Sequence, residues 1–255
     1  MKASHSSIKA AVVTGGASGI GAAIAKIVAG SGVAVAVADR SDKGQAVAEE
    51  IKAGGGEAFY VPVDVASEAS VAQAMFMTHH KYGGPDILIN CAGIFPRGTL
   101  ADTDVELWDR VMDINLKGTY LCCKAAVPYM IERGGGAIVN IGSTHASVGA
   151  SNLFAYSISK GAVVTLTRNL AKSLAADRIR VNCVHPGWVA SEGEIALREA
   201  SGHSLEWLIE QGSHMPSGRL QTGEDIAAAV SFLVSDQAAQ ISGQILTVDG
   251  GASVR

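Results

Sequence analysis

Tyr156 and Lys160 stand four residues apart in the segment Tyr-Ser-Ile-Ser-Lys, and Ser143 precedes Tyr156 by thirteen residues. A separation of four residues places two side chains on the same face of a helix. Tyrosine has an ordinary pKa of about 10, so it acts as a base near neutral pH only where a positive charge, such as a lysine ammonium, favours the phenolate. A serine hydroxyl can hydrogen-bond a substrate oxygen and hold the reacting carbon. The three residues therefore indicate proton transfer at a substrate oxygen.

A glycine-rich segment, Thr-Gly-Gly-Ala-Ser-Gly-Ile-Gly, occupies residues 14–21 between a strand-like run and a helix-like run. Gly15 allows a tight turn, while Gly19 and Gly21 let the backbone approach a pyrophosphate and let the helix pack closely on the strand. The free N–H groups at the start of the helix favour the phosphates. A tight turn without a ligand would also use glycines, but the strand–loop–helix context favours a dinucleotide site.

Asp39 ends the second strand-like run, where a carboxylate can accept hydrogen bonds from both hydroxyls of an adenosine ribose. The same carboxylate would repel a 2′-phosphate by on the order of several kcal/mol in a partly dry site. Asp39 thus favours NAD over NADP. Arg40 follows directly and could pair with a 2′-phosphate, so NADP stays as the alternative.

Strand-like apolar runs alternate with helix-like stretches along the chain. The expected strands cover 10–14, 33–38, 59–63, 86–90, 137–141, 179–184 and 245–248. The expected helices cover 20–29, 43–53, 71–81, 105–133, 155–175 and 226–234. This alternation predicts one α/β domain over residues 1–255, a Rossmann-like doubly wound parallel sheet of about seven strands with helices on both faces.

Ligands of such folds bind at the carboxyl ends of the strands, so the residues that follow each strand are the ones to consider. Asp64 and Val65 follow the third expected strand, where Asp64 could hydrogen-bond an adenine amino group and Val65 could pack on the ring. The segment Asn90-Cys91-Ala92-Gly93 follows the fourth strand and lies on the same predicted edge. Each of these residues, taken alone, would fit a turn better than a binding role.

Composition excludes several other classes of protein. The 255 residues carry a formal net charge of −4, which argues against a basic nucleic-acid surface. No apolar run approaches the roughly 18 residues of a transmembrane helix, and Met1 to Ala10 lacks the apolar stretch of a signal peptide. The four cysteines and seven histidines show no metal-ligand spacing, so we expect no metal, and free thiols in a reducing cytoplasm.

The order of these motifs resembles the short-chain dehydrogenase/reductase family over essentially the whole chain. The matching segments are Thr-Gly-x-x-x-Gly-Ile-Gly at 14–21, Asp64, Asn-x-Ala-Gly at 90–93, Asn115, Ser143, Tyr156-x-x-x-Lys160, Pro186-Gly187 and Asp249-Gly250-Gly251. The resemblance implies a nicotinamide-dependent enzyme that interconverts a secondary alcohol and a ketone. It also implies a homotetramer or homodimer built through 105–133, 155–175 and the C-terminal strand.

The resemblance further assigns roles to single residues. Tyr156 would be the acid/base, Lys160 would hold the nicotinamide ribose hydroxyls and lower the Tyr156 pKa, and Ser143 would orient the substrate oxygen. Asn115 would kink the helix over 105–133 and hold a water of the proton relay, while Asn90 would contact the adenosine side of the cofactor. The remaining implied cofactor contacts are Gly15, Ser18, Gly19, Ile20, Gly21, Asp39, Arg40, Asp64, Val65, Ala92, Gly93, Pro186, Gly187, Val189 and Ser191.

Two of these segments depart from the common family pattern. Cys91 stands where a second asparagine is commoner, and Ser191 stands where a threonine is usual. A serine hydroxyl can make the same hydrogen bond as a threonine, so neither departure argues against activity. Val189 would bond the nicotinamide carboxamide through its backbone.

The polar segment 188–218, which looks less regular than the rest, lies where the family places its substrate lid. It carries Glu192, Glu194, His203, Trp207 and His214. Arg97 and His145 are polar pocket candidates, and Leu153, Phe154 and Trp188 are candidates for apolar walls. One hypothesis is a sugar, polyol, hydroxy acid or other small secondary alcohol, with Arg97 pairing a carboxylate and His145 bonding a hydroxyl. The alternative for both is a solvated loop position.

Three other functions stay open. An NADPH-dependent ketone reductase of the 3-oxoacyl-thioester type would need Arg40 to outweigh Asp39. A non-redox protein of the same fold, such as a lyase or a cofactor-sensing regulator, usually lacks a catalytic or glycine-loop residue, and here all of them are present. A purely structural protein would have no reason to gather these residues at one sheet edge.

Overall fold

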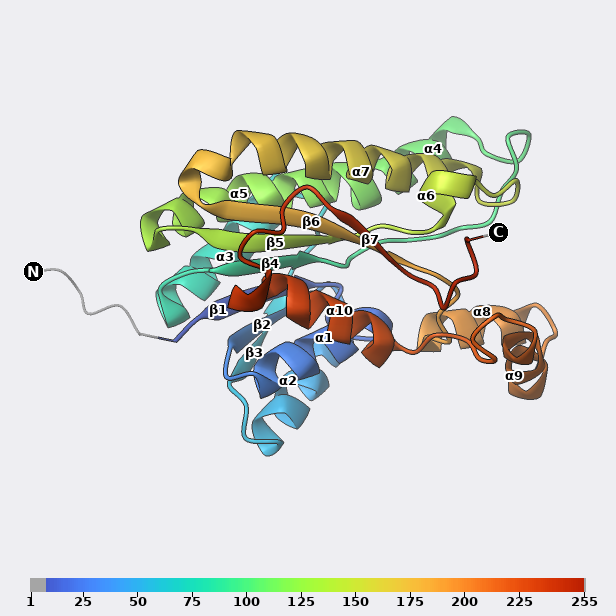
Figure 1. Ribbon diagram of the computed structural model, residues 1–255, viewed down its shortest axis with the longest axis horizontal. Coiled ribbons are helices and arrows are strands. Elements are labelled where there is room, and N and C mark those ends of the chain that lie inside the picture. Colours follow the sequence, from blue (N-terminus) through green and yellow to red (C-terminus); the bar gives the residue numbers. More distant parts are fainter. Residues whose placement is uncertain (1–7, 255) are drawn as a thin grey trace, which may run out of the picture.

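A computed structural model of the protein describes residues 8–254 (Figure 1). The expectation of no signal peptide concerns the first ten residues, of which 1–7 lie outside the described part. Within residues 8–254, no helix combines the length and the apolar character needed to span a membrane.

Seven strands in the described part of the chain form one parallel sheet in the order β3-β2-β1-β4-β5-β6-β7. Their bounds are β1 Ala10–Thr14, β2 Ala34–Asp39, β3 Ala58–Pro62, β4 Ile87–Asn90, β5 Gly136–Ile141, β6 Ile179–Pro186 and β7 Ile245–Val248. Val12 of β1 pairs with Ala36 on one side and with Leu88 on the other. The strand order therefore reverses between β1 and β4, and the loops after these two strands open a crevice for a ligand.

Helices cover both faces of this sheet, because successive residues of a buried strand point to opposite sides. Val13 belongs to one apolar core and its neighbour Val12 to the other. The first core is covered by α1 (Gly19–Gly30), α2 (Lys43–Ala53) and α10 (Gly223–Val234). The second is covered by α3 (Glu68–Tyr82), α5 (Gly118–Arg133) and α7 (Phe154–Ser173). The predicted Rossmann-like doubly wound fold is confirmed.

The helix expected over 105–133 changes its winding along its length. It consists of α4 (Val105–Met112), a wider π turn at Asp113–Lys117, and α5. Asn115 lies in the π turn, so the helix is irregular at the residue where a kink is expected. Such single π turns occur frequently at functional sites.

The segment 188–218, which looks less regular than the rest in the sequence, contains more regular structure than expected. It contains α8 (Glu192–Ala200) and α9 (Leu205–Ser213), which lie together beyond the strand ends (Figure 1). The Ser191 hydroxyl accepts a hydrogen bond from the Glu194 N–H, and the Ser204 hydroxyl accepts one from the Trp207 N–H. Each serine thus caps the N-terminus of a helix that the polar composition of the segment did not indicate. A short helix, α6 (His145–Val148), was also not predicted.

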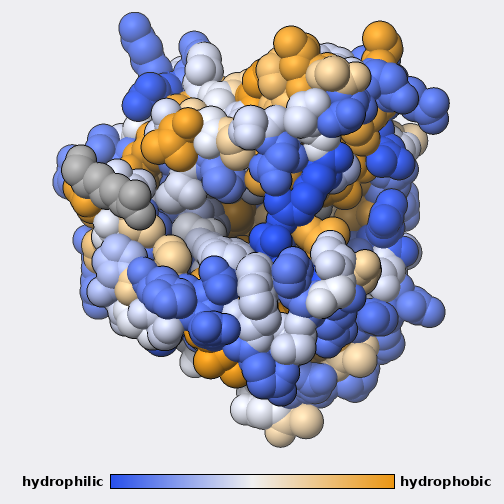
Figure 2. All heavy atoms as spheres, turned by 90° about the vertical axis from the view of Figure 1, so that its right-hand side faces the viewer, coloured by the Kyte–Doolittle hydropathy of each residue, from blue (hydrophilic) through white to orange (hydrophobic). Residues whose placement is uncertain are grey.

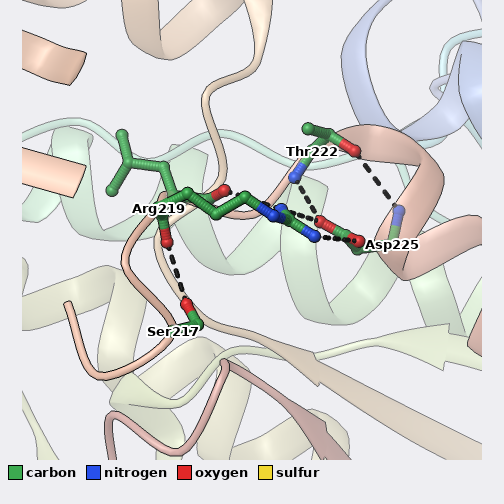
Figure 3. A network of polar contacts seen from close by, with 5 residues as sticks. Ser217, Arg219, Thr222 and Asp225 are labelled. Atoms are coloured by element: carbon green, nitrogen blue, oxygen red, sulfur yellow. Dashed lines mark hydrogen bonds and ion pairs between the residues drawn. The ribbon is translucent and has the colours of Figure 1, made fainter. Parts of the chain in front are cut away.

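A polar network fixes the point where this segment turns into α10 (Figure 3). The Thr222 hydroxyl accepts a hydrogen bond from the Asp225 N–H, and the Asp225 carboxylate accepts one from the Thr222 N–H. The Arg219 guanidinium donates two further bonds to this carboxylate, at 2.6 and 2.8 Å. Ser217 donates to the Arg219 carbonyl oxygen at 3.0 Å. This capping box sets the start of α10.

Candidate active site

A cleft of about 970 Å³ opens at the carboxyl ends of the strands. Figure 2 looks at this end of the molecule and shows a hollow at its centre with a largely polar rim. Nearly all of the predicted site residues line it: Gly15, Ser18, Gly19, Ile20, Gly21, Asp39, Arg40, Asp64, Val65, Ala92, Gly93, Arg97, Ser143, His145, Leu153, Tyr156, Lys160, Pro186, Gly187, Trp188, Val189 and Ser191. The tertiary structure therefore brings the predicted cofactor and catalytic residues into one place.

The glycine loop is packed so closely that larger residues would not fit. A Cβ atom on Gly21 would lie 2.0 Å from the Gly15 carbonyl oxygen, and one on Gly15 would lie 2.8 Å from the Ala92 backbone. Gly15 also has a φ of +67°, in the left-handed region that favours glycine. Ser18 makes no side-chain cap bond to α1 within the described structure. The first N–H groups of α1 are thus available to a phosphate in the cleft, so the loop fits a dinucleotide.

The backbone of two neighbouring loops holds the Asp39 carboxylate in place. One of its oxygens accepts a hydrogen bond from the Ala17 N–H at 3.1 Å, and the other accepts one from the Ser41 N–H at 2.9 Å. Each carboxylate oxygen has lone pairs left for further donors, such as ribose hydroxyls. Arg40 lines the same cleft, so both residues that bear on the choice between NAD and NADP are present.

Two contacts shape the walls around the remaining cofactor positions. Val65 is buried, and a Cβ on Gly118 of α5 would lie only 2.8 Å from its Cγ2, so Val65 is held against that helix. A Cβ on Gly93 would lie 3.2 Å from Asn115 Oδ1 and 3.5 Å from Lys160 Nζ. Gly93 therefore lets the backbone run past two polar side chains at the floor of the cleft.

The three predicted catalytic side chains converge. Lys160 is buried, its Nζ donates a hydrogen bond to the Ile141 carbonyl oxygen at 2.7 Å, and it lies 5.8 Å from the centre of the Tyr156 ring. Ser143 lines the same cleft and lies close enough to Tyr156 to affect the pKa of its phenol. Phe95, which the sequence did not single out, packs edge-on against Tyr156 with ring centres 6.3 Å apart. A hydroxyl–phenol–ammonium arrangement of this kind can exchange a proton with a substrate oxygen.

Burial governs the acidities at this site. It raises the pKa of Tyr156 above its ordinary value, and the hydrogen bond with Ser143 opposes this only in part. It lowers the pKa of Lys160 below its ordinary value. In the protein without its cofactor, the loss of hydration has the largest effect on the Tyr156 pKa. The expected lowering by Lys160 and the charge of a bound nicotinamide stays a prediction.

Two of the predicted catalytic and cofactor residues, Asn115 and Asn90, do not line the cleft. The Asn115 Oδ1 accepts a hydrogen bond from the Ile94 N–H at 2.8 Å, and its Nδ2 donates to the Ile94 carbonyl oxygen at 2.9 Å and to Ser159 Oγ at 3.0 Å. Asn115 therefore joins the loop after β4 to α7, next to Lys160. Its side chain positions the site from below.

Asn90 makes its side-chain hydrogen bonds inside the core. Its Nδ2 donates to Asn140 Oδ1 at 2.9 Å and to Cys123 Sγ at 3.3 Å, inside the core. Asn90 and Asn140 are direct partners in the register of β4 and β5, so their side chains share a face of the sheet. The side-chain Nδ2 therefore bonds within the protein, and the contact of Asn90 with the adenosine side of the cofactor stays a prediction.

The substrate end of the cleft contains a charged cluster that the sequence did not reveal. The Glu194 carboxylate accepts hydrogen bonds from Trp188 Nε1 at 2.8 Å and from Arg198 Nε at 2.7 Å. Arg97, from the loop after β4, has a guanidinium nitrogen 3.9 Å from the same carboxylate oxygen. Arg198 was not among the predicted residues, although the spacing of Glu194 and Arg198 would have indicated an ion pair had α8 been recognised.

Of the remaining substrate candidates, Leu153 and His145 line the cleft, whereas Phe154 does not. Leu153 is buried, forms an isolated bridge with Gly98 and supplies an apolar wall. The ring Nδ1 of His145 lies 3.3 Å from the Gly149 carbonyl oxygen, so its own loop engages one ring nitrogen. Among residues 8–254, no group of three or more His, Cys, Asp or Glu side chains is arranged to hold a metal ion. The expectation of no catalytic metal stays a prediction.

A parallel sheet with a phosphate-binding glycine loop at its crossover, and a Ser–Tyr–Lys set in the same cleft, defines a dinucleotide-dependent oxidoreductase. A family profile described as enoyl-(acyl carrier protein) reductase matches residues 15–253. The chain is 40% identical over 244 residues to cis-4-hydroxycyclohexanecarboxylate dehydrogenase from Sinomonas cyclohexanicum, covering 95% of this chain and 96% of that protein. It is 41% identical over 241 residues to 2-(S)-hydroxypropyl-CoM dehydrogenase 3 from Xanthobacter autotrophicus, covering 94% of each chain.

A solved structure from Beutenbergia cavernae is similar throughout, with a TM-score of 0.89, 36% identity, and coverage of 98% of this chain and 99% of that one. That protein is provisionally described as an NAD(P)-dependent gluconate 5-dehydrogenase and holds NADP at low occupancy. The chain belongs to the short-chain dehydrogenase/reductase family. It is an oxidoreductase of the type that acts on CH–OH groups.

Proposed function

We propose that the protein interconverts a secondary alcohol and a ketone with NAD as its cofactor and Tyr156 as the acid/base. One observation carries this proposal. Ser143, Tyr156 and Lys160 converge in the same cleft as the glycine loop and Asp39. A cofactor whose phosphates bind at that loop would extend along the strand ends toward Tyr156.

Each residue has a distinct part in the proposed reaction. The bound nicotinamide supplies the acceptor or donor for the hydride. Ser143 hydrogen-bonds the substrate oxygen and orients the reacting carbon. Tyr156 takes the hydroxyl proton in the oxidation and returns it in the reduction. Lys160 lies beside the Tyr156 ring and stabilises the phenolate through its charge.

Asp39 supports NAD as the cofactor. Its carboxylate is held by the Ala17 and Ser41 N–H groups, so it cannot easily swing away from a 2′-phosphate. The Asp39 carboxylate and a 2′-phosphate bound beside it would repel each other, whereas ribose hydroxyls would donate hydrogen bonds to the carboxylate.

The second candidate is an NADPH-dependent ketone reductase of the 3-oxoacyl-thioester type. Arg40 lines the cleft and could pair with a 2′-phosphate, and the similar structure from Beutenbergia cavernae holds NADP. The description of the matching family profile, enoyl-(acyl carrier protein) reductase, also names an acyl thioester substrate. Asp39 argues against this candidate, because its charge would have to be outweighed by an exposed arginine.

For the substrate we propose a small polar secondary alcohol, such as a sugar, a polyol or a hydroxy acid. Arg97, His145 and Trp188 line the cleft near Tyr156 and offer polar partners, while Leu153 offers an apolar wall. The two similar proteins named above are described as dehydrogenases of cis-4-hydroxycyclohexanecarboxylate and of 2-(S)-hydroxypropyl-CoM, each of which carries a secondary hydroxyl group.

We also propose a cytoplasmic homotetramer. All four cysteines, Cys91, Cys122, Cys123 and Cys183, are free thiols, as suits a reducing compartment. Large apolar side chains are exposed on the elements expected at the subunit contacts: Tyr120 and Ile131 on α5, Ile158 on α7 and Leu246 on β7. Apolar surface of this kind is typical of interfaces between chains.

The first test is the initial rate of nicotinamide reduction with NAD and NADP, on a panel of sugars, polyols, hydroxy acids and secondary alcohols. We expect activity with NAD that falls by at least about a thousandfold in Tyr156→Phe, because the proton acceptor is removed while the ring is kept. Phe95→Leu is the matched control for packing around this ring. Tight NAD binding without hydride transfer on any compound would instead favour a non-redox role.

A further inference from the structure

The inner wall of the lid is built around one carboxylate. Glu194 has a side chain only 10% exposed, and its Oε1 accepts bonds from both Trp188 Nε1 and Arg198 Nε. A buried carboxylate needs such charged and polar partners, because burial without them is strongly unfavourable. Glu194 therefore fixes the orientation of an indole and a guanidinium at the edge of the cleft.

Aromatic rings hold the Arg198 guanidinium from two elements. Its Cζ lies 5.1 Å from the centre of the Trp188 ring and 5.7 Å from that of Trp207 on α9. His203 stacks on Trp207 with ring centres 4.1 Å apart. Cation–π contacts of this kind restrict a side chain that is otherwise flexible. Arg198 is thus a fixed positive charge that lines the cleft.

Arg97 brings a second positive charge to the same place from outside the lid. Its side chain is 34% exposed, and its guanidinium reaches Glu194 only at 3.9 Å. That distance exceeds a hydrogen bond, while the two closer partners of Glu194 already occupy the same oxygen. Arg97 therefore points into the cleft with most of its donors free.

The charges at this end of the cleft do not cancel. Arg97 and Arg198 contribute two positive charges, and Glu194 contributes one negative charge. Asp249 also lines the cleft, but among the described residues it forms no ion pair with this cluster, and its carboxylate accepts hydrogen bonds from the N–H groups of Gly251 and Ser253. One positive charge is left over beside an apolar wall, which is an arrangement that suits an anionic group.

We infer that Arg97, backed by the Glu194–Arg198–Trp188 cluster of the lid, binds a carboxylate of the substrate, so that the substrate is a monocarboxylic hydroxy acid or the matching keto acid. This inference rests on the proposed function, because it assumes that the carbinol carbon lies at Tyr156. The planar guanidinium of Arg97 offers paired, charged donors that match a carboxylate, whereas a neutral sugar would bring no opposite charge to them. Glu194 and Arg198 act as positioning residues, and a dicarboxylate would leave one negative charge unpaired.

Binding can be tested apart from turnover, because Trp188 and Trp207 flank the site. Butanoate, pentanoate and hexanoate are titrated against their neutral amides, with tryptophan fluorescence as the readout and NAD present or absent. We expect saturable binding of a carboxylate at least about tenfold tighter than its amide. Arg97→Gln should abolish this preference and Arg97→Lys should restore part of it. Arg110→Gln, on α4, is the matched control and should change nothing.

Turnover gives the second readout. The same variants are assayed on 3-hydroxybutanoate, 4-hydroxypentanoate and 5-hydroxyhexanoate beside their amides, and Arg97→Gln should lower kcat/KM for the acids about tenfold or more while sparing the amides. Equal binding of acids and amides, an unchanged Arg97→Gln variant, or tighter binding of pentanedioate than of pentanoate would each overturn the inference. Carboxylate binding without hydride transfer on any alcohol would instead overturn the proposed function and leave the carboxylate site standing.

Discussion

Asp39 shows how a single side chain can carry a choice between two cofactors. Its carboxylate is fixed by two backbone N–H groups, one of them from the glycine loop that is to receive the phosphates. A charge held this firmly cannot relax to admit a second phosphate, so its effect on NADP is electrostatic and direct. The neighbouring Arg40 is exposed, and water screens its charge.

We predict that Asp39→Ala lowers kcat/KM with NAD by about tenfold to a hundredfold and narrows the preference for NAD over NADP. The loss comes from hydrogen bonds to a charged group, each worth roughly 1.5–3 kcal/mol. Steady-state rates with both cofactors measure the ratio, and Arg40→Gln serves as the comparison variant. A ratio that stays the same in Asp39→Ala would contradict our account of this residue.

At the scale of elements, the start of α10 is a local structure with its own electrostatics. The bidentate bond from Arg219, together with the Thr222 N–H, lowers the pKa of Asp225 to about 2. A carboxyl group whose pKa is lower in the folded than in the unfolded state stabilises the fold at pH values above its ordinary pKa, which is 3.8 here. That contribution is lost as the pH falls from about 4 toward 2.

Asp225→Asn should therefore lower the free energy of unfolding by about 1 kcal/mol at pH 7, as expected for a broken capping box. In a domain of this size this corresponds to a fall in Tm of about 2–4 °C. Thermal unfolding followed by circular dichroism between pH 7 and pH 3 measures the difference. The gap between the two proteins should narrow below pH 4, and a constant gap would show that the charge of Asp225 is irrelevant.

At the scale of the whole molecule, β7 is an edge strand, with a neighbouring strand on one side only in the described part of the chain. β7 is the last strand in the order, and Leu246 on it is 38% exposed. Phe232, on the adjoining α10, is 41% exposed. An open edge with apolar side chains promotes association of chains, so this edge is where we place one subunit contact.

We predict that Leu246→Arg converts the proposed tetramer into smaller species without unfolding the chain, because a charge would then be buried at the contact. Light scattering coupled to size-exclusion chromatography gives the mass of the assembly. Phe76→Arg, at a more exposed apolar position on α3, is the control and should leave the mass unchanged. A wild-type protein that elutes as a single chain would contradict the proposed assembly.

The sequence alone determined those features of the protein that depend on residues close together along the chain. The spacing of Gly15, Gly19 and Gly21 indicated the phosphate loop, because a strand–turn–helix needs these glycines at these positions. The four-residue spacing of Tyr156 and Lys160 placed them on one helix face. The alternation of apolar and helical runs predicted the parallel sheet, because strands buried on both faces are almost entirely apolar.

Only the tertiary structure decided which residues meet when they are far apart along the chain. The pairing of β4 with β5 turned Asn90 toward Asn140, and no local pattern records the register of two strands. Burial raises the pKa of Tyr156, and no local pattern shows this, because the loss of hydration depends on all the surrounding segments. Arg97 approaches Glu194 only once the lid is folded over the strand ends, and this contact between distant segments brings a second positive charge to the cleft.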